Sequence, residues 1–203
     1  TELAASARCA LEATVLDARS DDFPSALGCL KPQVVINLAG PFAFPDLRVP
    51  RACIAARAHG IDVADSRNHI ARVASLDADA RAAGVLIASG AISVPALSSA
   101  AADHLARGMA RVDSIDIAIS PGNRSGRGLA TVRSVLSLCG RTIEHADGQR
   151  EIVWGALTRH VFSAPAGARW LSPMDGPDLD LLPVRYAGHP TVRFRAGLEL
   201  GWM

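Results

Sequence analysis

The chain has 203 residues, of which 49% are hydrophobic and only 4% aromatic, and its formal net charge is +1. A chain of this length can bury a substantial core, in one large domain or two small ones, built mainly from Ala, Val, Leu and Ile. The near-neutral charge gives no reason to expect a nucleic acid or a membrane surface as a partner.

The four cysteines are Cys9, Cys29, Cys53 and Cys139. Because they are widely spaced and form no CxxC pair, they suggest neither a disulfide framework nor a zinc site, and we expect no metal. The sequence also has no signal peptide and no apolar run long enough to span a bilayer. These features predict a soluble protein of the cytoplasm.

The two ends of the chain suggest a fragment. Thr1 is not a start methionine, and Leu3–Leu11 has the pattern of a helix entered midway. Val192–Leu200 predicts a strand that stops almost at the last residue. We therefore expect the chain to be part of a longer protein.

The first half alternates short apolar runs with helical patterns. The runs predict four strands, at Ala13–Leu16, Gln33–Leu38, Ile61–Ala64 and Val85–Ser89. The segments between them predict three helices, at Phe23–Leu30, Leu47–His59 and Asn68–Ala83. Asp21 or Asp22 is the expected first N-cap, and Gly60 and Gly84 are the expected helix ends. This alternation is typical of βαβ units and a parallel sheet.

The stretch Gln33–Phe42 (QVVINLAGPF) is the centre of this pattern. Val34–Ile36 is apolar without alternation, which predicts a strand covered on both faces by helices. Gly40–Pro41 then breaks the backbone sharply. Open α/β sheets bind ligands beyond the carboxyl ends of their strands, so this turn is a candidate ligand site. A core strand followed by a tight turn is the alternative interpretation.

The second half begins near Ser93, and its pattern of apolar residues no longer alternates between short buried strands and helices. Pro95 can lie in the first turn of a helix that reaches about Gly108. Val112–Ser120 alternates apolar and polar residues, which predicts an antiparallel, half-exposed strand. A second helix should follow the loop at 121–128 and reach Cys139.

The last third of the chain contains a hairpin signal and a long irregular stretch. Asp147–Gly148 predicts the hairpin turn, between Ile143 and Val153. Ser163–Pro190 is rich in Pro, Gly and Asp and is expected to be loop-like. The fold class we predict is α/β: an incomplete Rossmann-type parallel sheet in residues 1–92, followed by an α+β domain for substrate and dimerisation in residues 93–203.

The loop Pro121–Gly128 (PGNRSGRG) carries the most suggestive polar pattern. Gly126 and Gly128 follow a predicted strand and open a helix, as in a dinucleotide fingerprint, but Thr131 stands where that fingerprint needs Gly or Ala. The loop also offers Asn123, Arg124 and Arg127 near a helix N-terminus, where they could hold a substrate carboxylate. An ordinary solvated loop is the alternative.

Two aspartates flank the end of the third predicted strand. Asp62 and Asp65 could face a ligand there, or they could cap the helix that begins near Asn68. His59 is most simply a structural residue at a helix end. No histidine or lysine is placed so that it can be named as the general acid, and the catalytic residues stay unknown.

Five motifs in order resemble the saccharopine dehydrogenase-like (saccharopine reductase) family. They are LDA at 16–18, VVINLAGPF at 34–42, IDVADSR at 61–67, SGAISVPALS at 89–98 and ISPGNRSGRG at 119–128. FRAGLE at 194–199 is similar to the closing strand of bacterial members. The resemblance implies a Rossmann domain followed by an α+β substrate domain.

The resemblance also implies hydride transfer between NAD or NADP and a carbon of a secondary amine or imine derived from an amino acid. The cofactor-binding residues it implies are Asp17 and Ala18 on the adenine side and Ala39, Gly40, Pro41, Phe42, Asp62, Ala64 and Asp65 toward the nicotinamide. The substrate-binding residues that we expect are Gly90, Pro95, Asn123, Arg124 and Arg127. The substrate is expected to be a carboxylated small molecule.

The sequence departs from the family in three places. The glycine-rich phosphate loop of the family would precede Thr1, so the fragment should bind a dinucleotide weakly or not at all. Ala96 stands where relatives usually have Gly. The acidic residue of the GxDPG motif is missing, since Ser93 and Val94 occupy that neighbourhood. Saccharopine itself is therefore doubtful as the substrate.

Two functions follow from the sequence. The first is an NAD(P)-dependent oxidoreductase, expected to form a homo-oligomer. Residues 1–203 alone are expected either to self-associate or to be poorly soluble, because the strand at Gln33–Leu38 would have an open apolar edge in the fragment. The alternative is a catalytically silent Rossmann-like scaffold or interaction protein.

Overall fold

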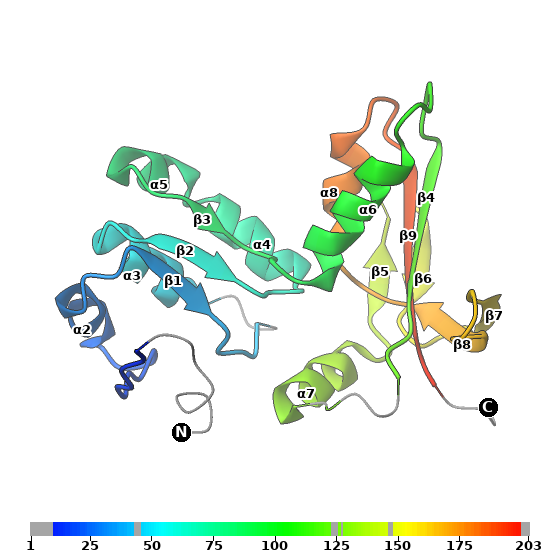
Figure 1. The fold of residues 1–203 in the computed structure, drawn as a ribbon. Helices are drawn as coiled ribbons and strands as arrows, with labels where there is room; N and C mark the ends of the chain where they lie inside the picture. Colours follow the sequence, from blue (N-terminus) through cyan, green and yellow to red (C-terminus); the bar gives the residue numbers. More distant parts are fainter. Residues whose placement is uncertain (1–9, 43–45, 123–125, 127, 146–147, 200–203) are drawn as a thin grey trace.

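The structure is a computed structural model that describes residues 10–42, 46–122, 126, 128–145 and 148–199. Its strands form a three-stranded sheet of order β1-β2-β3, a four-stranded sheet of order β4-β9-β8-β7, and a two-stranded hairpin β5-β6. Figure 1 shows the first sheet with its helices beside the four-stranded sheet with its own. The predicted α/β class with a parallel sheet is confirmed.

The first half contains the parallel sheet. Its strands are β1 (Val34–Asn37), β2 (His59–Asp62) and β3 (Ile87–Ala88). Its helices are α2 (Phe23–Cys29), α3 (Arg48–Ala55), α4 (Arg67–Ala74) and α5 (Asp77–Ala83). Both strand pairs are parallel, and the arrowheads of β1 and β2 point toward the second half (Figure 1).

The strand predicted at Ala13–Leu16 is wrong. These residues form no strand, and Val15 is 97% exposed. A strand is stable only when it pairs with another strand and packs its apolar side chains on a core, so β propensity alone does not make this segment a strand. The helix predicted at Leu3–Leu11 lies almost entirely outside the described residues.

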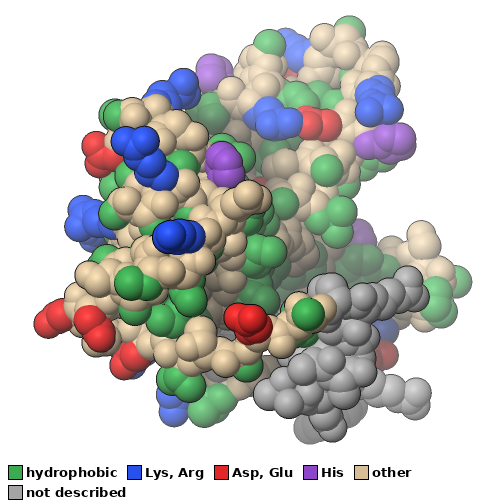
Figure 2. Space-filling view, turned by 60° about the vertical axis from the view of Figure 1, so that its left-hand side comes forward, with side chains coloured by type: hydrophobic (Ala, Val, Ile, Leu, Met, Phe, Trp, Pro, Cys, Tyr) green, Lys and Arg blue, Asp and Glu red, His purple; other side chains and the backbone are tan. Residues whose placement is uncertain are grey.

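The prediction that β1 is covered on both faces is also wrong. Val34 is 50% exposed and Ile36 is 64% exposed, and these alternate residues share one face of the strand. Val35, on the other face, packs with the buried cluster that contains Phe23 and Cys53. The space-filling view, which brings this half forward, shows hydrophobic side chains at the surface (Figure 2). Among the described residues, β1 is therefore an edge strand with one uncovered apolar face.

Gly60 does not end a helix. Helix α3 already ends at Ala55, and Gly60 is a buried residue of β2. A Cβ atom at Gly60 would lie 3.0 Å from Ile87 Cδ1 and 3.4 Å from Cys53 Sγ, so the glycine permits close packing of α3 against the sheet.

The helix predicted over Asn68–Ala83 is divided into α4 and α5. The Ser75 hydroxyl donates a hydrogen bond to the Arg72 carbonyl (2.7 Å), and Ser75 ends α4. A serine side chain that bonds the preceding turn competes with continued helix, which accounts for the break. Gly84 ends α5 in the left-handed conformation with φ of 71°, as predicted.

The second half is built around β9. The strands of the larger sheet are β4 (Ser114–Ile119), β7 (Thr158–Val161), β8 (Ala168–Pro173) and β9 (Thr191–Leu198), and the hairpin is β5 (Thr142–Glu144) and β6 (Arg150–Ile152). The helical elements are the turn η1 (Ser93–Leu97), α6 (Ser98–Leu105), α7 (Leu129–Leu138) and α8 (Asp178–Arg185). The hairpin and α7 lie where the sequence predicts them.

Two predictions about the second half are wrong. β4 is parallel to its partner β9, not antiparallel, because the last strand of the chain inserts between β4 and β8. The alternation of apolar and polar residues in β4 shows that one face of the strand is exposed. It does not show whether a partner strand far along the chain runs parallel or antiparallel. The stretch Ser163–Pro190 contains β8 and α8 and so is not loop-like.

One face of the larger sheet carries the core of this half. Val192 and Phe194 of β9 pack with Leu179 and Leu182 of α8 and with Ile143 of the hairpin, and all five are buried. The strands of the two halves belong to different sheets. The division into a cofactor domain (1–92) and a substrate domain (93–203) stays a prediction.

We expect residues 1–203 to self-associate through the free edge and uncovered face of β1. An edge strand presents unpaired N–H and C=O groups, and here it adds exposed apolar side chains. The change Ile36→Lys should lower the apparent mass measured by light scattering over a range of concentrations. Leu105→Lys, at a residue of α6 that is 69% exposed, is the matched control and should leave self-association unchanged. A monomeric wild type at high concentration would contradict this expectation.

Candidate functional site

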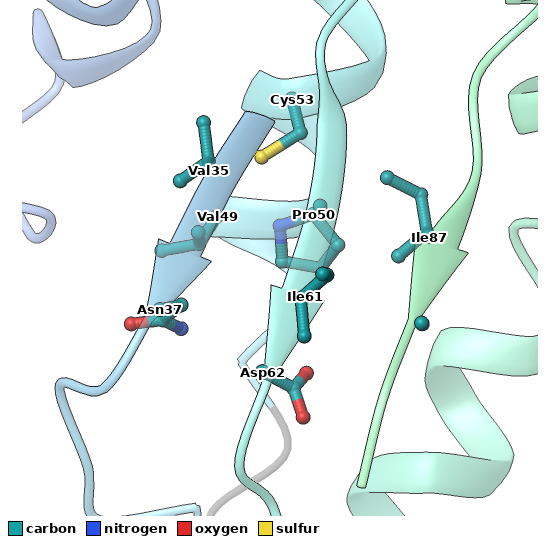
Figure 3. Close-up of a pocket in the computed structure, with 10 residues that line it drawn as sticks. Val35, Asn37, Val49, Pro50, Cys53, Ile61, Asp62 and Ile87 are labelled. Atoms are coloured by element: carbon teal, nitrogen blue, oxygen red, sulfur yellow. The ribbon is translucent and has the colours of Figure 1, made fainter. Parts of the chain in front are cut away.

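The carboxyl ends of the three parallel strands form one edge. Asn37 ends β1, Asp62 ends β2, and Ser89 directly follows β3. Figure 3 shows Asn37 and Asp62 at neighbouring strand ends, beside the apolar side chains between α3 and the sheet. The cavity at this place has a volume of about 10 Å³. That volume holds about one water molecule, so any larger ligand must lie outside it, beyond the strand ends.

Asp62 joins the ends of β2 and β3. Its side chain is buried, and Oδ1 accepts hydrogen bonds from the backbone N–H groups of Ala64 (3.0 Å) and Gly90 (3.1 Å). The Ser89 hydroxyl lies 2.7 Å from Oδ1 and 2.9 Å from Oδ2. Oδ2 also accepts a hydrogen bond from Nε2 of His69 (3.3 Å). One carboxylate thus fixes two strand-end loops and the first turn of α4.

These contacts decide the charge of Asp62. Burial acts to raise the pKa of its carboxyl group, but the hydrogen bonds from His69, Ala64, Ser89 and Gly90 lower that pKa below its ordinary value. The group is therefore a carboxylate at neutral pH, although water hardly reaches it.

His69 is a residue of this site that the sequence reasoning missed. It is 3% exposed, and its ring lies edge-on to the ring of Phe42, with centroids 5.4 Å apart. A signal was present in the sequence, because His69, Val73 and Leu76 recur at helical spacing and all three are buried. A histidine on such an apolar face needs a buried partner, which here is Asp62.

The turn after β1 presents its backbone at this edge. Asn37 Oδ1 accepts a hydrogen bond from the Ala39 N–H (3.1 Å), and Ala39, Gly40 and Pro41 are exposed. The Gly40–Pro41 peptide bond is cis. Phe42 is half-buried against His69. Of the stretch expected to face the nicotinamide, three residues are therefore open to solvent and one is anchored.

The loop after β2 contains Ala64 and Asp65. Ala64 is fully buried, whereas Asp65 is exposed. Ser66 is the N-cap of α4, since its hydroxyl accepts a hydrogen bond from the His69 N–H (3.4 Å). The alternative in which Asp62 or Asp65 caps this helix is wrong, because the serine already fills that role.

Gly90 and Pro95 form the passage to the second half. Gly90 has φ of 88°, and a Cβ atom there would lie 2.9 Å from Pro95 Cδ and 3.0 Å from Ile70 Cδ1. Only glycine fits this position without a shift of its neighbours. Two of the five residues predicted to bind substrate, Gly90 and Pro95, thus pack against each other next to the Asp62 cluster.

Asp17 and Ala18 lie in a turn before α2. The Asp17 carboxylate accepts a hydrogen bond from the Arg19 N–H (2.8 Å), and the Ala18 carbonyl accepts one from Arg48 Nη1 (3.3 Å). Arg48 is the first residue of α3, the helix that follows the β1 loop. The turn therefore lies next to the start of α3. The strand predicted at Ala13–Leu16, just before the turn, is not formed.

Arg67 connects the two halves of the molecule. Its Nε donates to Asp180 Oδ2 (2.7 Å), its Nη2 contacts Asp180 Oδ1, and its Nη1 donates to Asp175 Oδ1 (2.9 Å). These hydrogen bonds, with the charges of the same carboxylates, outweigh burial and raise the pKa of the guanidinium. A forked ion pair therefore holds the start of α4 against the α8 region.

The loop before α7 lies partly outside the described residues, and Asn123, Arg124 and Arg127 are among those not described. Gly128 is the N-cap of α7. The chain then forms the hairpin β5-β6, in which Glu144 pairs with Arg150 (3.2 Å). A dinucleotide fingerprint at Gly126–Gly128 would need a βαβ unit here, so the hairpin disfavours it.

A larger hollow of about 430 Å³ lies between the end of α6 and the end of α8. Asp103 at its wall accepts hydrogen bonds from Arg185 Nε (2.8 Å) and the Tyr186 hydroxyl (2.7 Å). Among the described residues, no group of three or more His, Cys, Asp or Glu side chains could hold a metal ion. None of the helices in the described part of the chain has the length and apolarity needed to cross a membrane.

Comparison with known proteins supports the fold. No protein-family model and no curated protein matches the sequence. Among solved structures, apo saccharopine dehydrogenase (L-Glu forming) from Saccharomyces cerevisiae is similar, with a TM-score of 0.63 and 18% sequence identity. The match covers 92% of this chain and 44% of the yeast chain, so this chain spans less than half of that enzyme's length. At this identity the similarity shows a shared Rossmann-like fold.

We expect Asp62→Asn to lower the free energy of unfolding at pH 7 by about 3 kcal/mol, because an amide cannot accept all the hydrogen bonds that the carboxylate receives. The folded pKa lies below the unfolded value of about 3.9, so the carboxylate stabilises the fold above that pH. The stabilisation is lost as the pH falls through the folded pKa. The difference between wild type and variant in the free energy of unfolding, measured with urea, should therefore become smaller below about pH 4. A difference that does not change with pH would contradict this expectation. Asp21→Asn, in an exposed turn, is the control.

We expect Arg67→Ala to lower the free energy of unfolding by about 1 kcal/mol, since Asp180 is partly exposed and water screens the pair. Arg67→Lys should restore less than half of that loss, because an ammonium cannot replace the forked guanidinium. Arg81→Ala is the control, as its pair with Asp77 is exposed on both sides. A double-mutant cycle with Asp180→Asn measures the coupling, and a coupling of zero would contradict the contact.

Proposed function

We propose that the chain forms part of an NAD(P)-dependent oxidoreductase similar to saccharopine dehydrogenase. The observation that carries the proposal is the edge described above, where three parallel strands end facing the second half of the molecule and Asp62 joins the ends of β2 and β3. In open α/β sheets this edge is the ligand-binding side. The shared fold with a dehydrogenase supports the same assignment.

In this proposal the exposed turn at 39–41 and Phe42 lie along the nicotinamide, with Asp65 at the neighbouring loop. Asp17 and Ala18 lie toward the adenine side. The residues fit these two ends of a dinucleotide because the Gly40–Pro41 turn is exposed and carries no long side chain. Within the described residues, no glycine-rich turn beside β1 is available for the pyrophosphate, so that part must come from elsewhere.

The substrate side is proposed to use Gly90 and Pro95 together with Asn123, Arg124 and Arg127. Two guanidinium groups suit a carboxylated, amino-acid-derived substrate, because each can form two parallel hydrogen bonds with a carboxylate. When bound, the nicotinamide would supply the hydride acceptor or donor. The protein's own part is to orient the two ligands, and the buried Asp62 carboxylate contributes by fixing the loops at the strand ends.

An interaction or scaffold protein is the second candidate. The exposure of Val34 and Ile36 beside a free strand edge favours it, because such a surface binds another polypeptide readily. A scaffold needs no cofactor, so binding of a nicotinamide dinucleotide separates the two candidates.

The test is titration with NADH and NADPH, followed by nicotinamide fluorescence. We expect residues 1–203 to show no tight binding, because a missing phosphate loop removes charge-assisted hydrogen bonds worth about 1.5–3 kcal/mol each. A loss of several such bonds weakens binding by several orders of magnitude. A chain that also carries the glycine-rich phosphate loop of the family should bind one of the two dinucleotides.

Two outcomes would change the proposal. Failure of the intact protein to bind either dinucleotide would favour the scaffold. Micromolar binding by residues 1–203 alone would mean that another loop holds the phosphates, and Gly122–Gly128 would be the first segment to test.

A further inference from the structure

We propose that His69 is a positioning residue of the cofactor site: Asp62 fixes its ring, and the ring in turn fixes Phe42 and the Gly40–Phe42 turn. The inference rests on the proposed function and deepens it, because it names the residue that holds the nicotinamide-facing turn in place. It depends on two contacts in series, one between His69 and Asp62 and one between His69 and Phe42.

The first contact fixes the imidazole. A carboxylate can only accept, so Nε2 of His69 carries the hydrogen that reaches Asp62 Oδ2 at 3.3 Å. The backbone N–H of His69 is also held, by the Ser66 hydroxyl at 3.4 Å. Because Asp62 is fixed by Ala64, Ser89 and Gly90, the ring of His69 is anchored to the ends of β2 and β3.

The second contact reaches the loop after β1. The rings of Phe42 and His69 meet edge to face, with centroids 5.4 Å apart and planes at 67°. This geometry is favourable for aromatic pairs and is lost if either ring turns. Phe42 directly follows the exposed Gly40–Pro41 turn, so its anchoring limits how that turn can move.

The remaining nitrogen of the ring argues against a role for His69 as a mere space-filling side chain. Nδ1 of His69 is buried and has no hydrogen-bond partner among the described residues. A side chain present only to fill this space would be Leu or Phe, which leave no polar atom unpaired. The imidazole is therefore accounted for by its link between Asp62 and Phe42, in which the second nitrogen takes no part.

Two variants break one contact each. His69→Gln keeps an N–H group near the position of Nε2 but has no ring for Phe42. His69→Phe keeps a ring but cannot donate to Asp62. Because the contacts act in series, each variant should release the turn. His145→Gln is the matched control, since His145 forms a similar pair with Glu151 (2.9 Å) in the other half of the molecule, and its side chain is 8% exposed.

The experiment measures dissociation constants of the intact protein for the dinucleotide that it binds and for ADP-ribose, which lacks the nicotinamide. Measurements are made well below the unfolding temperature of every variant. We expect both His69 variants to bind the dinucleotide at least tenfold more weakly and ADP-ribose as the wild type does. The His145 variant should bind both ligands normally even if its unfolding temperature falls.

A second measurement needs no cofactor. Nitrogen NMR of residues 1–203 with isotope-labelled histidine side chains, at neutral pH, should show a hydrogen on Nε2 of His69. A neutral ring with its hydrogen on Nδ1 and none on Nε2 would overturn the proposal, and this readout applies even if a variant does not fold.

The outcomes distinguish the proposed function from the role of His69. A wild type that binds neither dinucleotide contradicts the proposed function. A wild type that binds, with variants that bind equally well or lose dinucleotide and ADP-ribose to the same extent, contradicts the role of His69 alone.

Discussion

The buried carboxylate of Asp62 is the constraint on which the strand-end region depends. A charge this far from water persists only when hydrogen bonds surround it, and here they come from Ala64, His69, Ser89 and Gly90. These donors belong to the loops after β2 and β3 and to α4. The loops therefore cannot move independently without uncovering the charge, which gives a parallel sheet of only three strands a rigid edge.

The lateral edge of the same sheet, at β1, is much less constrained. In the part of the chain that the structure describes, β1 has one partner strand, and the face that carries Val34 and Ile36 is uncovered. Rigidity at the strand ends and exposure at the sheet edge are compatible, because the first comes from polar contacts at the carboxyl ends and the second from the absence of a neighbour beside β1. The described residues thus contain a well-formed ligand edge on an incomplete layer.

The sequence predicted those features that depend on local pattern. The strand β1, the glycine that ends α5 and the hairpin at Gly148 are all set by neighbouring residues, and all were found, although the expected cover on both faces of β1 was not. Features that depend on distant partners were missed. Ala13–Leu16 needs a neighbour to be a strand, and the direction of β4 is decided by β9, which comes more than seventy residues later. Pro177 and Pro183, which suggested a loop, lie at the start of α8 and inside it.

The same division applies to the candidate site. Asp62 was found because it ends a strand, but its partner His69 was missed because its importance comes from a buried bond between two elements. The junction follows this pattern: Gly90 packs on Pro95, and Arg67 forks onto Asp175 and Asp180 from the first turn of α4. Arg67 stands two residues from His69 on the same turn, so the helix that holds the buried carboxylate also holds the second half. A ligand at the strand ends would therefore contact a surface whose two sides are positioned by one short helix.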